Sequence, residues 1–165
     1  MYQIQPVTTF FIGGCIKVNR YPEWWNHTLT IFNRCEDDQT RVITWYKTVL
    51  HNCFWQESED KLSVGETIIK TNSTKCRVPV NKNFKEKFEW EQLSPIDRAK
   101  YFTFGTDDII VRGEVTDTID EYSSGQRSSD LLNKYKKLQG CMKINKCSIN
   151  TGAGRGCEHY YVKGV

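Results

Sequence analysis

The stretch that decides the fold is residues 41–50, RVITWYKTVL, in which β-branched and aromatic side chains alternate along the chain. In an extended conformation Thr44, Tyr46 and Thr48 fall on one face, and Ile43 and Trp45 fall on the other. Successive side chains of a strand point to opposite faces, so this alternation predicts a β-strand.

Shorter stretches of the same kind lie on both sides of it. They predict strands at residues 8–18, 27–32, 66–70, 76–80, 84–90, 100–104, 108–115, 141–147 and 158–162. Turn residues separate them about every ten residues, a spacing typical of β-sandwiches and barrels. Two short helices are also predicted. One begins at Pro95 after the cap residue Ser94, and the other starts at residues 128–130 and ends before Gly140.

The composition points to one β-rich domain that covers residues 1–165. The chain has 165 residues, 38% hydrophobic and 26% charged, with a net charge of +3, which is ordinary globular composition. No apolar run approaches the length that spans a bilayer, so we expect no membrane segment. We therefore predict an all-β fold, a two-sheet β-sandwich with one or two short helices. The start of the chain shows no signal peptide, and we expect a domain taken from a longer secreted protein.

Cysteines and glycosylation triplets favour an oxidising, secreted setting. The sequence holds no CxxC pair, and two N-glycosylation acceptors stand at Asn26 and Asn72. We predict a disulfide-stabilised protein with about three bridges and one thiol left over, and the pairing stays open. The alternative is a cytosolic protein with buried thiols. The candidate cysteines are Cys15, Cys35, Cys53, Cys76, Cys141, Cys147 and Cys157.

The charges are segregated along the chain. Residues 106–121 are acidic, with Arg112 as the single base, and residues 134–165 are basic, with Glu158 as the single acid. An acidic surface can attract a basic protein, and a basic surface can hold a sulfated polysaccharide. The alternative for each is a solvated face. The lysines that would contact a glycosaminoglycan are Lys134, Lys136, Lys137, Lys143 and Lys146.

No arrangement typical of an enzyme is visible. Glu57 and Glu59 are expected in a polar loop, where no burial would raise the pKa of either carboxyl group. The segment from Cys157 to His159 could supply metal ligands, but a disulfide near a surface histidine is the simpler interpretation. We therefore expect no catalytic activity, no metal and no cofactor, and neither nucleic acid nor a membrane as partner.

Two segments carry a resemblance to a known family. Residues 8–14, TTFFIGG, resemble the Gly-Gly strand of the secreted poxvirus chemokine-binding proteins. Residues 93–100, LSPIDRAK, followed by 107–112, DDIIVR, resemble the short helix and the acidic strand of that family. The size is similar to that of the SECRET domain, the chemokine-binding C-terminal domain of viral tumour-necrosis-factor receptor homologues.

The resemblance implies a secreted viral decoy that sequesters host chemokines through one exposed sheet face. Chemokines are basic, so acids on that face would pair with them. From the charge segregation, the expected contact residues are Asp108, Arg112, Glu114, Asp117, Asp120, Glu121 and Tyr122.

Two other functions stay open. One is a lipocalin-like salivary carrier from a blood-feeding parasite, which would hold a small amine or a lipid inside a barrel. The other is a pathogen effector or adhesion domain with a protein partner.

Overall fold

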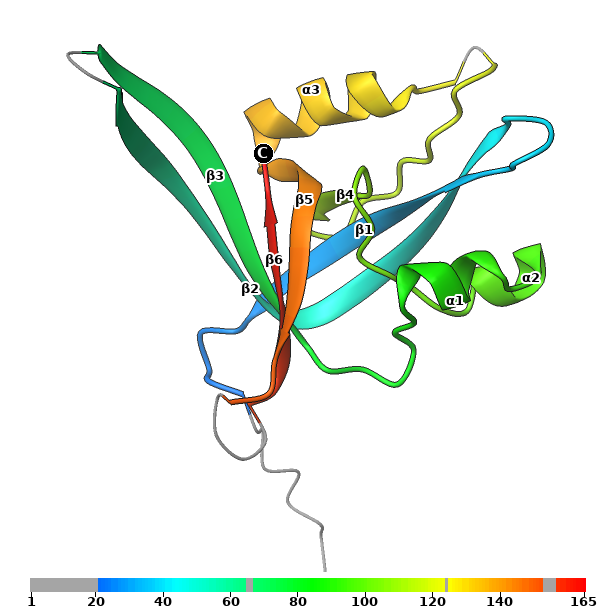
Figure 1. The fold of residues 1–165 in the computed structure, drawn as a ribbon, viewed down its shortest axis with the longest axis horizontal. Helices are drawn as coiled ribbons and strands as arrows, with labels where there is room; N and C mark the ends of the chain where they lie inside the picture. The colour runs from blue at the N-terminus through cyan, green and yellow to red at the C-terminus, as the bar shows by residue number, and fades with distance from the viewer. Residues whose placement is uncertain (1–20, 65–66, 124, 153–156) are drawn as a thin grey trace, which may run out of the picture.

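The computed structural model describes residues 21–64, 67–123, 125–152 and 157–165, and of residues 60–64 and 67–72 it describes only the backbone. Six strands and three helices lie in these ranges (Figure 1). Their order is β1 (His27–Glu36), β2 (Ile43–Val64), β3 (Thr67–Pro79), α1 (Lys87–Glu91), α2 (Pro95–Arg98), β4 (Ile109–Arg112), α3 (Ser128–Leu138), β5 (Cys141–Asn150) and β6 (His159–Gly164).

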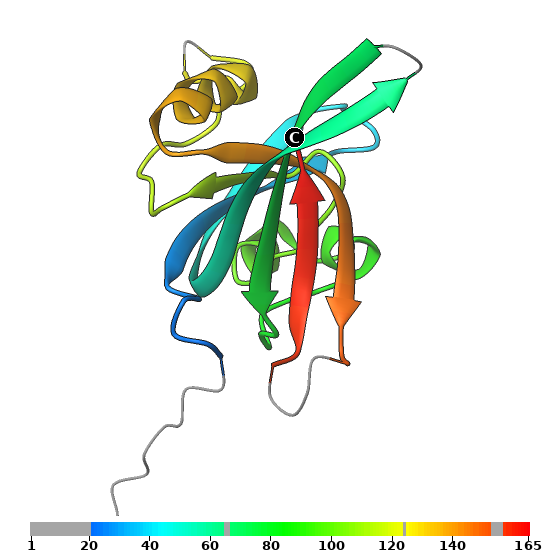
Figure 2. The same ribbon diagram turned by 90° about the vertical axis from the view of Figure 1, so that its left-hand side faces the viewer.

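The strands form one closed antiparallel barrel in the order β1-β2-β3-β6-β5-β4. The prediction of an all-β fold is confirmed. The predicted arrangement of the strands in two separate sheets is not. Two strands account for the closure. The first part of β2 pairs with β1 and its second part, from Phe54, pairs with β3. In the same way β5 pairs first with β4 and then, from Ile144, with β6. Figure 2 shows β3, β6 and β5 side by side on one wall.

The interior of the barrel is filled by its own side chains. Inward-facing residues of all six strands form one buried cluster, which includes Leu29, Trp55 and Met142. Phe102 and Phe104 enter this cluster from the segment between α2 and β4, which was predicted to be a strand. That prediction is wrong, because in the described structure the segment makes one isolated β-bridge, at Phe102, and no strand. Its alternating aromatic side chains fill the barrel instead.

Helix α3 covers the outer face of β1, β4 and β5. Its buried residues Leu131 and Tyr135 pack with Phe32, Ile109 and other outward-facing side chains in a second cluster. The helix was predicted at these residues, and Gly140 follows it with a φ of +94°. None of the helices in the described ranges is long and apolar enough to cross a membrane.

Helices α1 and α2 lie against the barrel away from α3 (Figure 1). Ser94 caps α2 as expected, because its hydroxyl accepts a hydrogen bond from the backbone N–H of Asp97. The strand predicted at residues 84–90 is wrong, since residues 87–91 form α1. There Trp90 is fully buried and donates its indole N–H to the carbonyl oxygens of Arg98 and Tyr101.

The cysteines do not form the predicted disulfide framework. Five of the seven are free thiols: Cys35, Cys53, Cys76, Cys141 and Cys147. Cys15 lies outside the described residues together with the predicted strand at 8–18. Three bridges are therefore absent. Cys53 and Cys76 pack inside the barrel as small apolar side chains. Their role in the core accounts for these two cysteines without a disulfide bond.

Candidate functional site

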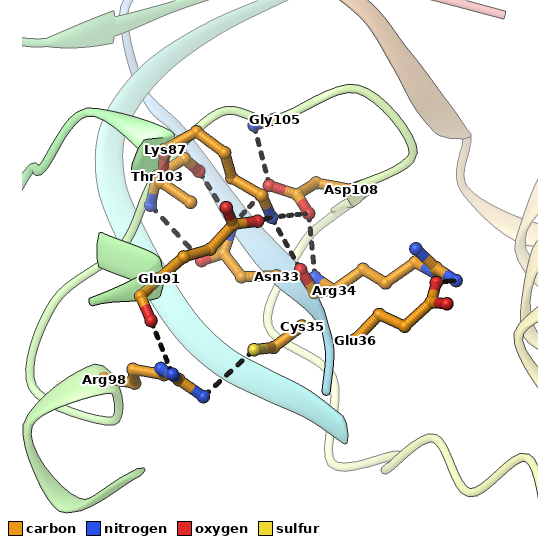
Figure 3. Close-up of polar contacts among 10 residues, drawn as sticks. All are labelled: Asn33, Arg34, Cys35, Glu36, Lys87, Glu91, Arg98, Thr103, Gly105 and Asp108. Atoms are coloured by element: carbon orange, nitrogen blue, oxygen red, sulfur yellow. Dashed lines mark hydrogen bonds and ion pairs between the residues drawn. The ribbon is translucent and has the colours of Figure 1, made fainter. Parts of the chain in front are cut away.

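Asp108 is not on the exposed acidic surface predicted for it. Its side chain is fully buried and accepts hydrogen bonds from the side-chain amide of Asn33 and the backbone N–H groups of Arg34 and Gly105, at 2.7 to 2.8 Å (Figure 3). The ammonium group of Lys87 lies 3.3 Å away. Burial raises the pKa of Asp108 despite this cation. Asp108 therefore joins β1, α1 and β4 and cannot touch a partner in this conformation.

Three more of the predicted contact residues bind within the chain. Asp117 accepts hydrogen bonds from the ammonium group of Lys134 at 2.7 Å and from the hydroxyl of Tyr135 on α3. Glu121 accepts the indole N–H of Trp45 at 3.1 Å. Asp120 binds the turn that follows it. These contacts fix the segment between β4 and α3 against the barrel.

The other predicted contact residues are exposed. Tyr122 is 61% exposed, although its hydroxyl accepts a hydrogen bond from the backbone N–H of Ile43 at 2.6 Å. Arg112 and Glu114 are exposed on either side of Gly113. Of the seven residues predicted to meet a basic partner, Glu114 is thus the exposed acid with no side-chain hydrogen bond or ion pair in the described part of the chain.

The basic segment is partly neutralised. Lys134 pairs with Asp117, and Lys143 pairs with Asp107 at 2.8 Å. Lys137 and Lys146 are exposed on α3 and β5. Two of the five lysines are therefore paired with acids of the same chain.

The predicted glycosylation sites are placed only in part. Asn26 is exposed immediately before β1. The backbone at Asn72 belongs to β3, and its side chain lies outside the described residues.

A pocket of about 400 Å³ opens at the mouth of the barrel, and we call it the mouth pocket. The inward-facing series of β2 runs through Cys53 and Trp55 and continues to Glu57 and Glu59, where the β2–β3 hairpin extends beyond the barrel. Trp55 is buried and donates its indole N–H to Glu57 at 2.9 Å. The mouth pocket is lined by Glu57, Ser58, Glu59, Ser73, Thr74, Lys136, Gly140, Cys141 and Val165.

The sequence does not predict the mouth pocket. Glu57 and Glu59 were expected in a polar loop, and that prediction is wrong because both belong to β2. The signal was present, since they continue the period of two that begins at Cys53 and Trp55. Lys136 and Gly140 reach the pocket from the other side, at the end of α3 and just beyond it.

The chemistry of the mouth pocket is that of a binding site for charged groups. Glu57 accepts one hydrogen bond, from Trp55, and no cation of the described residues lies within 4 Å of its carboxylate. The hydroxyl of Ser58 contacts that of Ser73 at 3.0 Å across the hairpin. A carboxylate of this kind can accept hydrogen bonds from an ammonium group.

A second hollow, of about 520 Å³, lies between the β1–β2 turn and the pair α1 and α2. Its charges are mostly paired inside the chain: Arg34 and Arg41 bind Glu36, and Lys87 lies near both Glu91 and Asp108. Arg98 there donates hydrogen bonds to the thiol sulfur of Cys35 at 3.0 Å and to the carbonyl oxygen of Glu91 at 2.5 Å (Figure 3).

The thiol in this second hollow is poorly suited to nucleophilic chemistry. Burial raises the pKa of Cys35 in spite of the nearby Arg98 and Lys87, whereas a reactive cysteine needs a lowered pKa. Across the described ranges, no three His, Cys, Asp or Glu side chains are grouped so that they could hold a metal ion.

The chain matches the model of a known protein family. A family model described as a family of unknown function, DUF6751, matches residues 24–165. The chain belongs to the DUF6751 family. The match covers all six strands and three helices, so the barrel and the mouth pocket both lie within the DUF6751 region. No curated protein and no solved structure matches the chain.

Proposed function

We propose that this DUF6751 protein is a binding barrel that holds a small, polar, amine-bearing molecule in the mouth pocket. The observation that carries the proposal is the position of Glu57, a carboxylate that lines a pocket at the barrel mouth without a cation partner among the described residues. Ligand sites occur preferentially in such places, and 400 Å³ lies within the usual range for small molecules.

The filled interior supports a polar ligand over a lipid. A lipid chain would need an apolar cavity, and the barrel interior holds Phe102, Phe104 and Tyr160 instead. Carboxylates and hydroxyl groups form much of the lining of the mouth pocket. Of the two ligands considered for a carrier, the amine therefore fits better.

The test is a titration of the purified protein with ethylamine, isoamylamine and phenethylamine by isothermal calorimetry. We expect saturable binding of at least one amine, weakened at least tenfold in Glu57→Gln. The matched control is Glu89→Gln, which changes an exposed acid of α1 outside the pocket lining and should leave binding unchanged. Absence of binding by all three amines, together with no small molecule in native mass spectra, would overturn the proposal.

The second proposal is the one implied by the family resemblance, capture of a basic chemokine by a secreted viral protein. The exposed carboxylate of Glu114 beside Arg112 supports it, because a solvated acid is free to pair with a basic partner. In this proposal the ring of strands acts as two facing sheets joined by β2 and β5. The free thiols remove the cysteine argument for secretion, which now depends on the resemblance and the glycosylation triplets.

Surface plasmon resonance against a chemokine panel at two salt concentrations tests this second proposal. Salt-sensitive binding that weakens in Glu114→Gln, but not in the exposed control Asp38→Asn, would support it. If no chemokine of the panel binds, this second proposal is overturned and the carrier proposal stands.

A further inference from the structure

The mouth pocket displays two opposite charges on different walls. Glu57 comes from β2, and Lys136 comes from the last turn of α3. The two side chains form no ion pair with each other, because no nitrogen–oxygen distance between them is within 4 Å. Lys136 forms no ion pair with any other residue in the described ranges either. Both lie close to the thiol of Cys141: burial raises the pKa of this thiol, Lys136 lowers it and Glu57 raises it further.

Gly140, which also lines the pocket, leaves room for the side chain of Glu57. Gly140 follows α3 with a φ of +94°, and a Cβ atom at this position would collide with the Glu57 carboxylate. Glycine both permits the left-handed turn and leaves space for the acid. The turn after α3 therefore leaves room for the Glu57 carboxylate in the pocket that Lys136 also lines.

We propose that the mouth pocket binds an amino acid or a closely related zwitterion, with its ammonium group on Glu57 and its carboxylate on Lys136. This inference depends on the proposed carrier function and specifies the ligand class. A simple amine would leave Lys136 unpaired and close to a like charge, and a simple acid would do the same to Glu57. A zwitterion pairs with both walls at once.

The experiment compares three ligands on each of three carbon skeletons by isothermal calorimetry. The amino acids are alanine, leucine and phenylalanine. The amines are ethylamine, isoamylamine and phenethylamine, and the acids are propionate, 4-methylpentanoate and 3-phenylpropionate. We expect at least one amino acid to bind about tenfold or more tightly than the amine and the acid of its skeleton.

Two variants assign the charges. Lys136→Met should reduce the affinity for the amino acid to that of the matching amine and leave amine binding unchanged or improved. Glu57→Gln should weaken both the amino acid and the amine. Lys137→Met is the matched control, because this exposed lysine neighbours Lys136 on α3 but does not line the pocket.

The outcomes separate the two proposals. Amines that bind as tightly as the amino acids, with no effect of Lys136→Met, would overturn the zwitterion and leave the amine carrier in place. Binding of none of the nine compounds would overturn both. Binding of the acids alone would contradict both as well, since Glu57 would then have no role.

Discussion

The ammonium nitrogen of Lys87 lies 3.3 Å from a carboxylate oxygen of Asp108, a side chain with no surface exposed to solvent. The same carboxylate accepts hydrogen bonds from the backbone of Arg34 and Gly105. The pair therefore connects α1 to the start of β4 and to β1, which are far apart in the sequence (Figure 3).

We expect Asp108→Asn to lower the free energy of unfolding by about 3–5 kcal/mol, because it leaves buried donors without an acceptor and removes the nearer of the two carboxylates beside Lys87. Urea denaturation measures the loss. The control is Asp107→Asn, where the side chain is half exposed and its pair with Lys143 should contribute at most about 1 kcal/mol. Equal losses in the two variants would contradict the structural role given to Asp108.

The contact of Asp117 with α3 predicts a pH dependence. Hydrogen bonds from Lys134 and Tyr135 lower the pKa of Asp117 below the ordinary value of 3.8. The native protein keeps this carboxylate charged where the unfolded chain takes up a proton, so the contribution to stability is present above pH 3.8 and is lost as the pH falls through the lowered pKa.

Asp117→Asn should therefore be less stable than the parent protein at neutral pH, and the difference should shrink as the pH falls below 3.8. Urea denaturation at a series of pH values gives this difference directly. A difference that stays constant down to the acid limit would show that the carboxylate has no favourable interaction in the folded state.

The buried thiols predict slow alkylation. Burial raises the pKa of Cys53 from 9.0 to about 12, which lowers the thiolate fraction about a thousandfold. In the native protein without reductant, iodoacetamide should modify Cys53 and Cys76 at least about a hundredfold more slowly than in urea. Peptide mass spectrometry follows each site. A disulfide at either residue would instead leave it unmodified in urea as well.

Gly140 and Gly113 form a matched pair for the mouth pocket. Both have positive φ, +94° and +96°, so alanine at either position should cost about 1–2 kcal/mol of stability. A Cβ atom at Gly140 also collides with Glu57, whereas at Gly113 it approaches the flexible end of Gln139. Only Gly140→Ala should therefore weaken amine binding. Equal effects of the two variants on binding would contradict the position of Glu57 in the pocket.

Much of the barrel could be predicted from local pattern, but its closure could not. Alternation identified β1, β4, β5 and β6 and part of β2, because these strands have one face in the barrel. Alternation does not reveal that β2 and β5 each change partner part-way along. Phe102 and Phe104 show the same ambiguity, since an alternating pair of aromatics is compatible with a strand and with a segment that fills a barrel.

The candidate site was harder to predict because charge along the sequence does not show which charges pair in space. The acidic run around Asp108 and Asp117 suggested an exposed surface, yet these two carboxylates bind Lys87 and Lys134 from distant helices. The polar neighbours of Glu57 favour a loop at this point of the sequence. The role of Glu57 depends on α3, which follows it by some seventy residues and brings Lys136 to the same pocket.

The strand order of the barrel also sets the order in which it can be assembled. The β1–β2 and β2–β3 pairings join neighbouring segments, so they close short loops and can form early. The pairing of β3 with β6 joins Thr74 to Gly164 and must wait for a much longer loop to close. The mouth pocket needs β2, β3, the end of α3 and also Val165, which directly follows β6. Ligand binding would then begin only after β6 has paired with β3, and it would report this late step of folding.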